Sequence, residues 1–279
     1  MARFLTPFII LILFFCNQGF AQILQNDSAV NKQFFKLEES IKGDFAVFNV
    51  DAIGNIYVIT PSDQLKKIKP DGTLAAVYND VKRYGKLNSI DVHNPLKILI
   101  YYKNYTAIVM LDKLLSFRNQ IELKPLQYID VNTAATTYDN NIWIYDEQNF
   151  KIKKLDDKGL LLLEFADLRT LFDIAPSAEK LIDEDNHLYL IDKEQGVFIF
   201  DYYGAFNRLI PINNLSDITI EKNYLVGFRD TIMEVVQLKN LTSKKYALPV
   251  LNEKIKSLKF INNKLYILTQ TGLNIYRLE

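Results

Sequence analysis

The chain contains 279 residues, and its 33 basic and 33 acidic side chains give a formal net charge of zero. Proteins whose main partner is nucleic acid or an anionic membrane need a basic excess, so this balance argues against both partners. Hydrophobic residues make up 49% of the chain and charged residues 24%, enough for a large core and a soluble surface.

The first 21 residues predict a secretory signal peptide. Arg3 precedes an apolar run over residues 4–15, which is too short to span a bilayer comfortably. Gly19 and Ala21 then supply the small residues of a cleavage site. We therefore expect cleavage after Ala21 and a mature chain of residues 22–279.

Cys16 is the only cysteine of the chain and offers a rival interpretation, a lipoprotein anchor. The residue before a lipid-modified cysteine is normally small, whereas Phe15 is bulky, so signal cleavage is favoured. A mature chain without cysteine excludes disulfides, cysteine nucleophiles and cysteine metal sites. No later segment predicts a transmembrane helix, because charged residues interrupt the most apolar stretch, residues 98–117.

One strand motif recurs six times at a spacing of roughly 42 residues, and it begins with a polar residue followed by apolar and aromatic side chains. The copies occupy residues 55–60, 97–102, 141–146, 187–192, 223–228 and 264–269. A short strand precedes each copy, and turns with further strands follow it. Four short strands per repeat are typical of a propeller blade, whereas a solenoid or a sandwich would not give this pattern. We predict an all-β, six-bladed β-propeller of four-stranded blades that forms one domain over residues 22–279.

The two ends of the mature chain predict how the ring closes. The sixth repeat ends after three strands, at residue 279. A strand-like segment at residues 33–38, which includes Phe34, Phe35 and Leu37, lies near the mature N-terminus. If this segment supplies the missing outer strand of the last blade, both sheet edges are paired.

The first repeat resembles the NHL-like and TolB-like six-bladed propellers. It has the turn Asp51-Ala-Ile-Gly-Asn55, an Ile-Tyr-Val strand and a second turn at Pro70-Asp-Gly72, as those families do. The other repeats match only in part. The resemblance implies an architecture and not an activity, since such propellers include lactonases, lyases, scaffolds and receptors.

The composition also resembles that of exported Bacteroidota proteins, with a signal ending Gly-Phe-Ala-Gln and many Lys, Asn, Ile and Tyr residues. Residues 27–29 and 230–232 resemble O-glycosylation sites of that group. An exported propeller of this size is similar to the plug subunit of the type 9 secretion translocon. This resemblance implies a location in the periplasm or at the periplasmic face of the outer membrane, with an outer-membrane translocon as partner; extracellular release is the alternative.

No familiar catalytic motif is present. The two histidines, His93 and His187, have no zinc-ligand spacing, and nucleophile-elbow, P-loop and dinucleotide motifs are absent. Asn49, Asp91 and Asp130 are the middle residues of the predicted first strands of three blades. Six-bladed lactonases hold a divalent cation in the channel with such side chains, so calcium is a candidate ligand. A register shift of one residue would move these side chains away from the axis, and structural hydrogen bonding is the favoured role.

Five tyrosines fall at predicted strand ends or turns and are candidates for an exposed binding patch: Tyr101, Tyr102, Tyr105, Tyr202 and Tyr203. The favoured hypothesis is an exported, non-catalytic subunit without a cofactor that binds a protein partner. The alternatives are a metal-dependent lactonase- or lyase-like hydrolase with a channel site, and a carbohydrate-binding protein.

Overall fold

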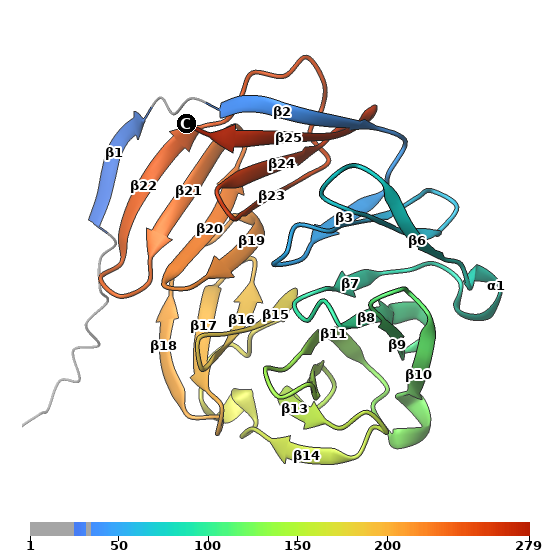
Figure 1. Ribbon diagram of the computed structural model, residues 1–279. Helices are drawn as coiled ribbons and strands as arrows, with labels where there is room; N and C mark the ends of the chain where they lie inside the picture. The colour runs from blue at the N-terminus through green and yellow to red at the C-terminus, as the bar shows by residue number, and fades with distance from the viewer. Residues whose placement is uncertain (1–24, 32–34) are drawn as a thin grey trace, which may run out of the picture.

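The computed structural model describes residues 25–31 and 35–279, and its sheets are arranged as blades around a common axis (Figure 1). Each of the six blades has four antiparallel strands, which confirms the predicted all-β, six-bladed propeller. Blade 1 contains β3 (Val47–Val50), β4 (Ile56–Ile59), β5 (Leu65–Ile68) and β6 (Leu74–Tyr78). Blade 2 contains β7 (Ser89–Asp91), β8 (Lys97–Tyr102), β9 (Ala107–Asp112) and β10 (Phe117–Glu122). Blade 3 contains β11 (Val131–Thr136), β12 (Ile142–Asp146), β13 (Lys151–Leu155) and β14 (Leu161–Glu164).

The remaining blades continue around the ring in chain order (Figure 1). Blade 4 contains β15 (Lys180–Glu184), β16 (His187–Asp192), β17 (Gly196–Asp201) and β18 (Phe206–Ile210). Blade 5 contains β19 (Ser216–Glu221), β20 (Tyr224–Arg229), β21 (Ile232–Gln237) and β22 (Thr242–Ala247). Blade 6 contains β23 (Ser257–Ile261), β24 (Lys264–Leu268), β25 (Gly272–Leu278) and β2 (Phe35–Lys42). Short helices lie in the connections: α1 (Val81–Tyr84), η1 (Lys103–Tyr105), η2 (Lys124–Leu126) and η3 (Leu168–Thr170).

The hydrophobic core lies between adjacent blades. The second strand of a blade is apolar on both faces because a neighbouring blade covers each face, and β4, β8 and β12 are buried along their whole length. Tyr57 of blade 1, for example, packs in one cluster with Ile98 and Ile100 of blade 2. Fully burying a side chain of this size contributes about 1.5–3 kcal/mol. The six repeats therefore stabilise one another in sequence around the ring.

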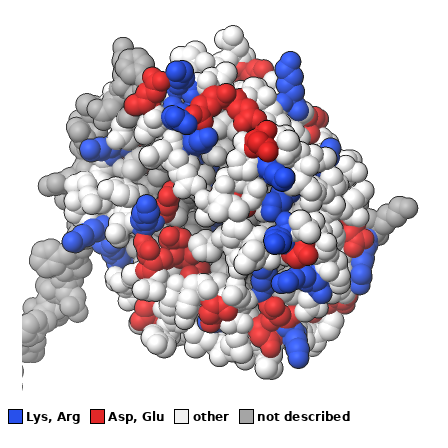
Figure 2. Space-filling model, in the orientation of Figure 1, with Lys and Arg blue, Asp and Glu red and all other residues white. Residues whose placement is uncertain are grey.

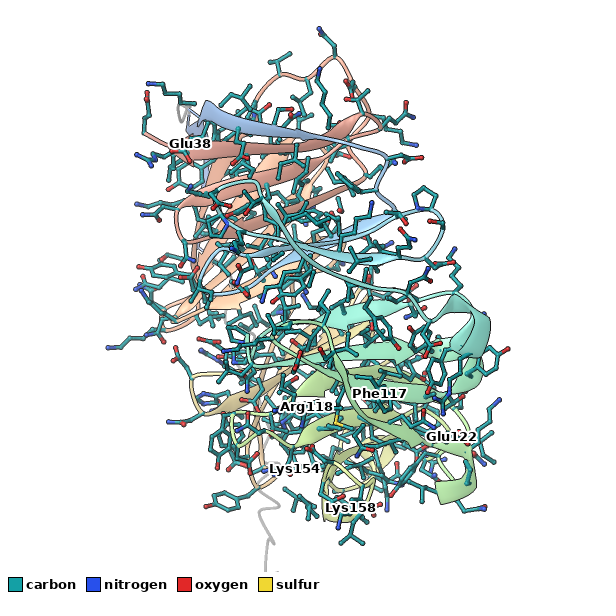
Figure 3. All side chains as sticks on the ribbon, turned by 45° about the vertical axis from the view of Figure 1, so that its right-hand side comes forward. Glu38, Phe117, Arg118, Glu122, Lys154 and Lys158 are labelled. Atoms are coloured by element: carbon teal, nitrogen blue, oxygen red, sulfur yellow. The ribbon has the colours of Figure 1, made fainter. Side chains whose placement is uncertain are left out.

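Strand β2, near the N-terminus, closes the ring as predicted. β2 pairs antiparallel with β25, with Phe35 opposite Leu278 and Lys42 opposite Gly272. Phe35 is half-buried against the core of blades 5 and 6, whereas Leu37 is 53% exposed, so Leu37 acts through its backbone. Phe34 lies outside the described residues. Glu38, labelled in Figure 3, joins β2 to its blade through ion pairs with Lys264 and Arg277 at 2.8 and 2.5 Å.

A further strand was not predicted. β1 (Gln25–Asn31) pairs in parallel with β22 and adds a fifth strand to blade 5 (Figure 1). The sequence of β1 is mostly polar and has no alternating apolar pattern. Strand β1 covers the outer edge of blade 5 through backbone hydrogen bonds. Backbone hydrogen bonds do not require particular side chains, so the sequence does not indicate this strand.

The predicted signal peptide, residues 1–21, lies outside the described residues, so export stays a prediction. Within residues 25–31 and 35–279, no helix is long and apolar enough to cross a membrane.

Candidate functional site

The central channel holds a cavity of about 630 Å³ lined by residues from the inner strands of all six blades. These strands are β3, β7, β11, β15, β19 and β23. Small-molecule sites in proteins have volumes of roughly 300–1,000 Å³, so the channel is large enough for a ligand. Its polar side chains are therefore the first candidates for a functional site.

Polar side chains of the channel bond to the backbone of the next blade. Asn49 of blade 1 donates a hydrogen bond from Nδ2 to the carbonyl oxygen of Ile90 in blade 2, at 2.8 Å. Oδ2 of Asp91 accepts one from the backbone N–H of Thr136 in blade 3, at 2.5 Å. These contacts connect neighbouring inner strands and satisfy backbone groups of the channel wall.

The same arrangement recurs in the later blades. Lys180 of blade 4 donates to the carbonyl oxygen of Ile218 in blade 5 at 2.9 Å. Asp217 of blade 5 accepts from the backbone N–H of Leu258 in blade 6 at 3.2 Å. Lys259 connects the last blade to the first by donating to the Asn49 side chain of blade 1. Structural hydrogen bonding, the favoured role for Asn49 and Asp91, thus accounts for their contacts.

The three predicted metal ligands do not come together. Asn49 and Asp91 line the channel, but Asp130 does not. The first strand of blade 3 is β11, which begins at Val131, so Asp130 belongs to the preceding connection. Ala135 holds the position in β11 that Asn49 holds in β3, opposite an aromatic residue of the second strand. Among the described residues, no group of three or more His, Cys, Asp or Glu side chains is placed to hold a metal ion.

Two lysines dominate the chemistry of the channel. Lys180 and Lys259 keep accessible surface because the channel admits water, but the inner strands surround both side chains. This loss of bulk solvent lowers the pKa of both ammonium groups. The pKa of Lys259 falls to about 7, first through desolvation and then through repulsion by Lys180. Lys180 belongs to blade 4 and Lys259 to blade 6, and both line the same cavity.

One mouth of the channel carries a histidine and an acidic residue. Nδ1 of His93 lies 3.9 Å from Oε2 of Glu184. Desolvation raises the pKa of the Glu184 carboxyl group, and the negative charges of Asp185 and Glu221 contribute to the rise. Because this pair contains only one histidine, it does not supply the ligands of a zinc site.

The five predicted binding tyrosines do not form one patch. Tyr101 and Tyr102 are 0% and 2% exposed, because β8 continues through both residues and packs between blades. The prediction that they are surface residues was wrong. Tyr105 is 55% exposed in the turn between β8 and β9, whereas Tyr202 and Tyr203 lie at the opposite end of the strands, between β17 and β18.

Tyr203 belongs to a set of rigid turns that join strands on one face of the ring. In each turn an aspartate Oδ1 accepts hydrogen bonds from the backbone N–H groups two and four residues ahead, at 2.8–3.1 Å. The aspartates are Asp51, Asp112, Asp156 and Asp201. Such Asx turns fix the backbone and direct the residue at the tip outward.

Bulky apolar residues stand at three of these four tips. Ile53 is 68% exposed, Leu114 62% and Tyr203 88%. Other turns at the same ends of the strands also expose large apolar side chains. We define the turn face by these seven residues: Ile53, Leu96, Leu114, Tyr138, Leu160, Tyr203 and Tyr224.

Contacts between blades hold the turns of this face in place. Asn94 of blade 2 donates to Asn140 of blade 3 at 2.5 Å, and Asn262 of blade 6 donates to the carbonyl oxygen of Ala52 in blade 1 at 3.0 Å. Tyr138 stacks on Tyr202 with ring centroids 4.5 Å apart. In the view of Figure 2, basic and acidic side chains are interspersed over the surface, with uncharged areas between them.

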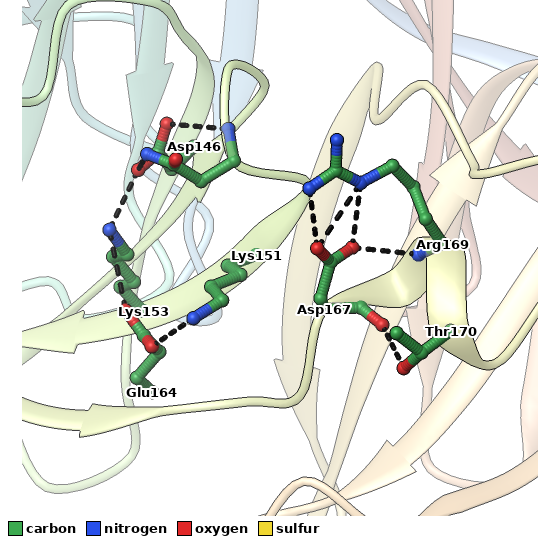
Figure 4. Close-up of polar contacts among 8 residues, drawn as sticks. Asp146, Lys151, Lys153, Glu164, Asp167, Arg169 and Thr170 are labelled. Carbon is green, nitrogen blue, oxygen red and sulfur yellow. Dashed lines mark hydrogen bonds and ion pairs between the residues drawn. The ribbon is translucent and has the colours of Figure 1, made fainter.

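A paired charge cluster in blade 3 has a structural role. The buried carboxylate of Asp146 forms an ion pair with Lys153 at 2.7 Å, and Glu164 pairs with Lys151 at 2.5 Å (Figure 4). Asp167 binds Arg169 through a bidentate contact nearby. Because these charges have partners within the protein, the cluster does not present itself as a ligand site.

No protein-family model matches the chain, and no curated protein matches it in sequence. Solved structures do match it. A catalytically inactive virginiamycin B lyase from Staphylococcus aureus with quinupristin is 12% identical, with a TM-score of 0.62 over 88% of this chain and 100% of that one. The WD40 domain of Neurospora crassa Pan2 is 9% identical, with a TM-score of 0.65 over 88% and 96%. YCF48 bound to D1 peptide is 9% identical, with a TM-score of 0.56 over 90% and 100%.

At these identities the likeness shows the propeller fold alone. One of these neighbours is a lyase and another is bound to a peptide, so the fold does not decide between catalysis and binding. The resemblance to the type 9 plug subunit gains no support from these neighbours.

Proposed function

We propose that this protein is an exported, non-catalytic β-propeller that binds a protein partner through its turn face. The observation that carries the proposal is the presence of Ile53, Leu114 and Tyr203 at the tips of hydrogen-bonded turns, each more than 60% exposed. Apolar and aromatic side chains that are already held in place lose little conformational entropy on binding, which favours their use as anchors.

The remaining support comes from location and from fold. The signal-like residues 1–21 favour export, and YCF48, which shares the propeller fold, is bound to a peptide. We place the protein in the periplasm or at the periplasmic face of the outer membrane, with extracellular release as the alternative. The resemblance to the plug subunit makes an outer-membrane translocon the first partner to test.

The test compares two pairs of exposed apolar residues on opposite faces. Ile53→Ser with Tyr203→Ser alters the turn face, and Ile174→Ser with Val250→Ser alters the connections at the other ends of the strands. Ile174 and Val250 are 71% and 97% exposed, so they match the turn-face residues in chemistry and exposure. Each tagged protein is purified from the cell envelope, and the amount of co-purified partner is measured.

We expect the wild-type protein and the Ile174/Val250 variant to recover one partner in a fixed ratio. The Ile53/Tyr203 variant should recover at least about tenfold less, since loss of two anchors of about 1 kcal/mol or more each reduces affinity by that factor. Equal recovery by both variants, or isolation of the wild-type protein alone, would contradict the proposal. Thermal unfolding of each variant shows whether it is folded.

A further inference from the structure

The channel contains two cations whose hydrogen-bond acceptors are neutral. Nζ of Lys180 donates to the carbonyl oxygen of Ile218 at 2.9 Å, and Nζ of Lys259 donates to the amide oxygen of Asn49. An ammonium group has three N–H donors, so each lysine retains donor capacity toward the channel. Both side chains line the cavity of about 630 Å³.

The nearby carboxylates accept hydrogen bonds from backbone N–H groups. Asp91 accepts from the N–H groups of His93 and Thr136, at 2.8 and 2.5 Å, and Asp217 accepts from that of Leu258 at 3.2 Å. Among the described residues, no carboxylate forms an ion pair with either channel lysine. The wall of the channel thus leaves two positive groups without a directly bound counterion.

Other charged groups influence the lysines from a distance. Asp91 and Asp217 favour the charged form of both lysines, while Asp51 acts in the same sense on Lys259 and Glu179 on Lys180. Asp51 is itself bonded to Asn55 and Tyr57, at 2.8 and 3.1 Å. These carboxylates attract the ammonium groups but accept no direct hydrogen bond from them.

We propose that Lys180 and Lys259 together bind the oxyanion group of a small molecule, a carboxylate or a phosphate, inside the channel. An oxyanion between the two ammonium groups accepts charge-assisted hydrogen bonds from both and removes their mutual repulsion. The carboxylates nearby restrict the ligand to a compact anion, since a bulky polyanion would approach Asp91 and Asp217. This site is separate from the turn face and does not depend on the proposed partner.

Protonation of Lys259 gives the site a defined pH response. The low pKa of Lys259 means that part of the population is neutral near pH 7, and a bound anion favours the protonated form. Binding therefore takes up a proton, and affinity falls as the pH rises above about 7. Loss of binding at higher pH is a signature that a nonspecific salt effect does not produce.

The first experiment measures thermal unfolding and calorimetric binding at pH 6.5 with sodium phosphate, acetate or succinate, each against sodium chloride at equal ionic strength. A specific ligand raises the melting temperature because it binds only the folded state. We expect phosphate or a carboxylate to raise the melting temperature. Comparing phosphate with acetate and succinate identifies which oxyanion group the site prefers. Lys180→Met and Lys259→Met should each weaken binding at least about tenfold, the loss of one charge-assisted hydrogen bond. Lys158→Met, at an exposed turn tip, should not weaken it.

A second measurement keeps the proposal testable if a methionine variant fails to fold. In the wild-type protein, Lys259 is acylated with an amine-reactive reagent at pH 7.5, and the modification is located by mass spectrometry. The preferred anion should slow acylation of Lys259 and leave that of Lys158 unchanged. The proposal is overturned if no anion exceeds chloride in stabilising the protein, if both methionine variants keep the full effect, or if the anion gives Lys259 no protection.

Discussion

Lys259 of the last blade donates a hydrogen bond to the side chain of Asn49 in the first blade, across the point where the ring closes. Asn49 also bonds to blade 2, because its Nδ2 group donates a hydrogen bond to the carbonyl oxygen of Ile90. One asparagine thus links three blades. The closure of the propeller rests on this side chain at the channel as well as on the pairing of β2 with β25 at the rim.

Replacing Asn49 should therefore destabilise the ring. Asn49→Ala leaves the carbonyl oxygen of Ile90 and the ammonium group of Lys259 without this partner, and we expect a loss of about 1–3 kcal/mol in the free energy of unfolding. Urea unfolding measures the change. Asn252→Ala, at an exposed position of a connection, is the control and should lie within about 0.5 kcal/mol of wild type. Equal stability of the two variants would show that the Asn49 contacts contribute nothing.

The two N-terminal strands should differ in importance. Deleting residues 22–31 removes β1 from the edge of blade 5 and should leave a folded, monomeric ring. Deleting residues 22–42 also removes β2, which exposes the edge of β25 and should cause aggregation. Size-exclusion chromatography and circular dichroism distinguish these outcomes. A soluble, fully folded protein without β2 would contradict the predicted closure.

Asp183 accepts two hydrogen bonds in the buried contact between blades 3 and 4, from Nε1 of Trp143 at 2.8 Å and from the hydroxyl of Tyr202 at 2.6 Å. Asp183→Ala should cost about 1–3 kcal/mol for each buried donor left unpaired. Asp183→Asn keeps an acceptor oxygen and should cost less. Trp143 is the only tryptophan, so its fluorescence follows unfolding directly. If Asp183→Asn cost as much as Asp183→Ala or more, the acceptor oxygen would not be what stabilises this contact.

Local sequence signals predicted the elements that depend on neighbours in the chain. The turn from Asp51 to Asn55 was recognisable because an Asx turn starts with an aspartate or an asparagine, and because glycine suits the positive φ of 87° that Gly54 adopts. The segment containing Phe35 was recognisable as a closing strand because Phe34, Phe35 and Leu37 give it a strand-like pattern and the last blade lacked a strand. β1 was missed because it is polar and pairs through its backbone alone.

The channel site could be predicted only in part. Asn49 and Asp91 were placed at the axis, but Asp130 was not there, because β11 consists mainly of small and polar residues and carries a weak strand signal. Whether Lys180 and Lys259 line one cavity depends on how blades 4 and 6 face one another. No spacing along the chain encodes that relationship, and only the closed ring brings the two side chains into one cavity.

Chelation tests the alternative of a metal-dependent hydrolase. Asn49 and Asp91 already bond to backbone groups of the channel wall, and Asp130 lies outside it. We therefore expect excess EDTA to change the melting temperature by less than about 1 °C. If the protein did bind an ion present at 100 times its dissociation constant, that ion would contribute about 2.7 kcal/mol of stability, and its removal would lower the melting temperature by more than this. Elemental analysis of the purified protein provides the second measurement. Stoichiometric calcium, lost on chelation together with stability, would restore the hydrolase hypothesis.

The charge on Lys259 should make stability depend on pH in a defined direction. Its pKa falls from the usual value of 10.5 to about 7 in the folded protein, so between these values the unfolded chain binds a proton that the folded chain has released. The free energy of unfolding therefore gains a contribution that rises from about pH 7 toward pH 10. Lys259→Met lacks this contribution. Urea unfolding of both proteins between pH 6 and pH 9 isolates it as a difference.

We expect the methionine variant to gain most over wild type at pH 6, where the charged lysine is least favourable, and the gap to narrow as the pH rises. Lys158→Met, which removes an exposed lysine, should show a constant difference across the same range because its charge stays in water. A gap for Lys259→Met that stays constant from pH 6 to pH 9 would mean that the folded protein keeps Lys259 charged over the whole range. The channel carboxylates, led by Asp91, would then outweigh desolvation, and the ammonium pair would have no need of an external anion.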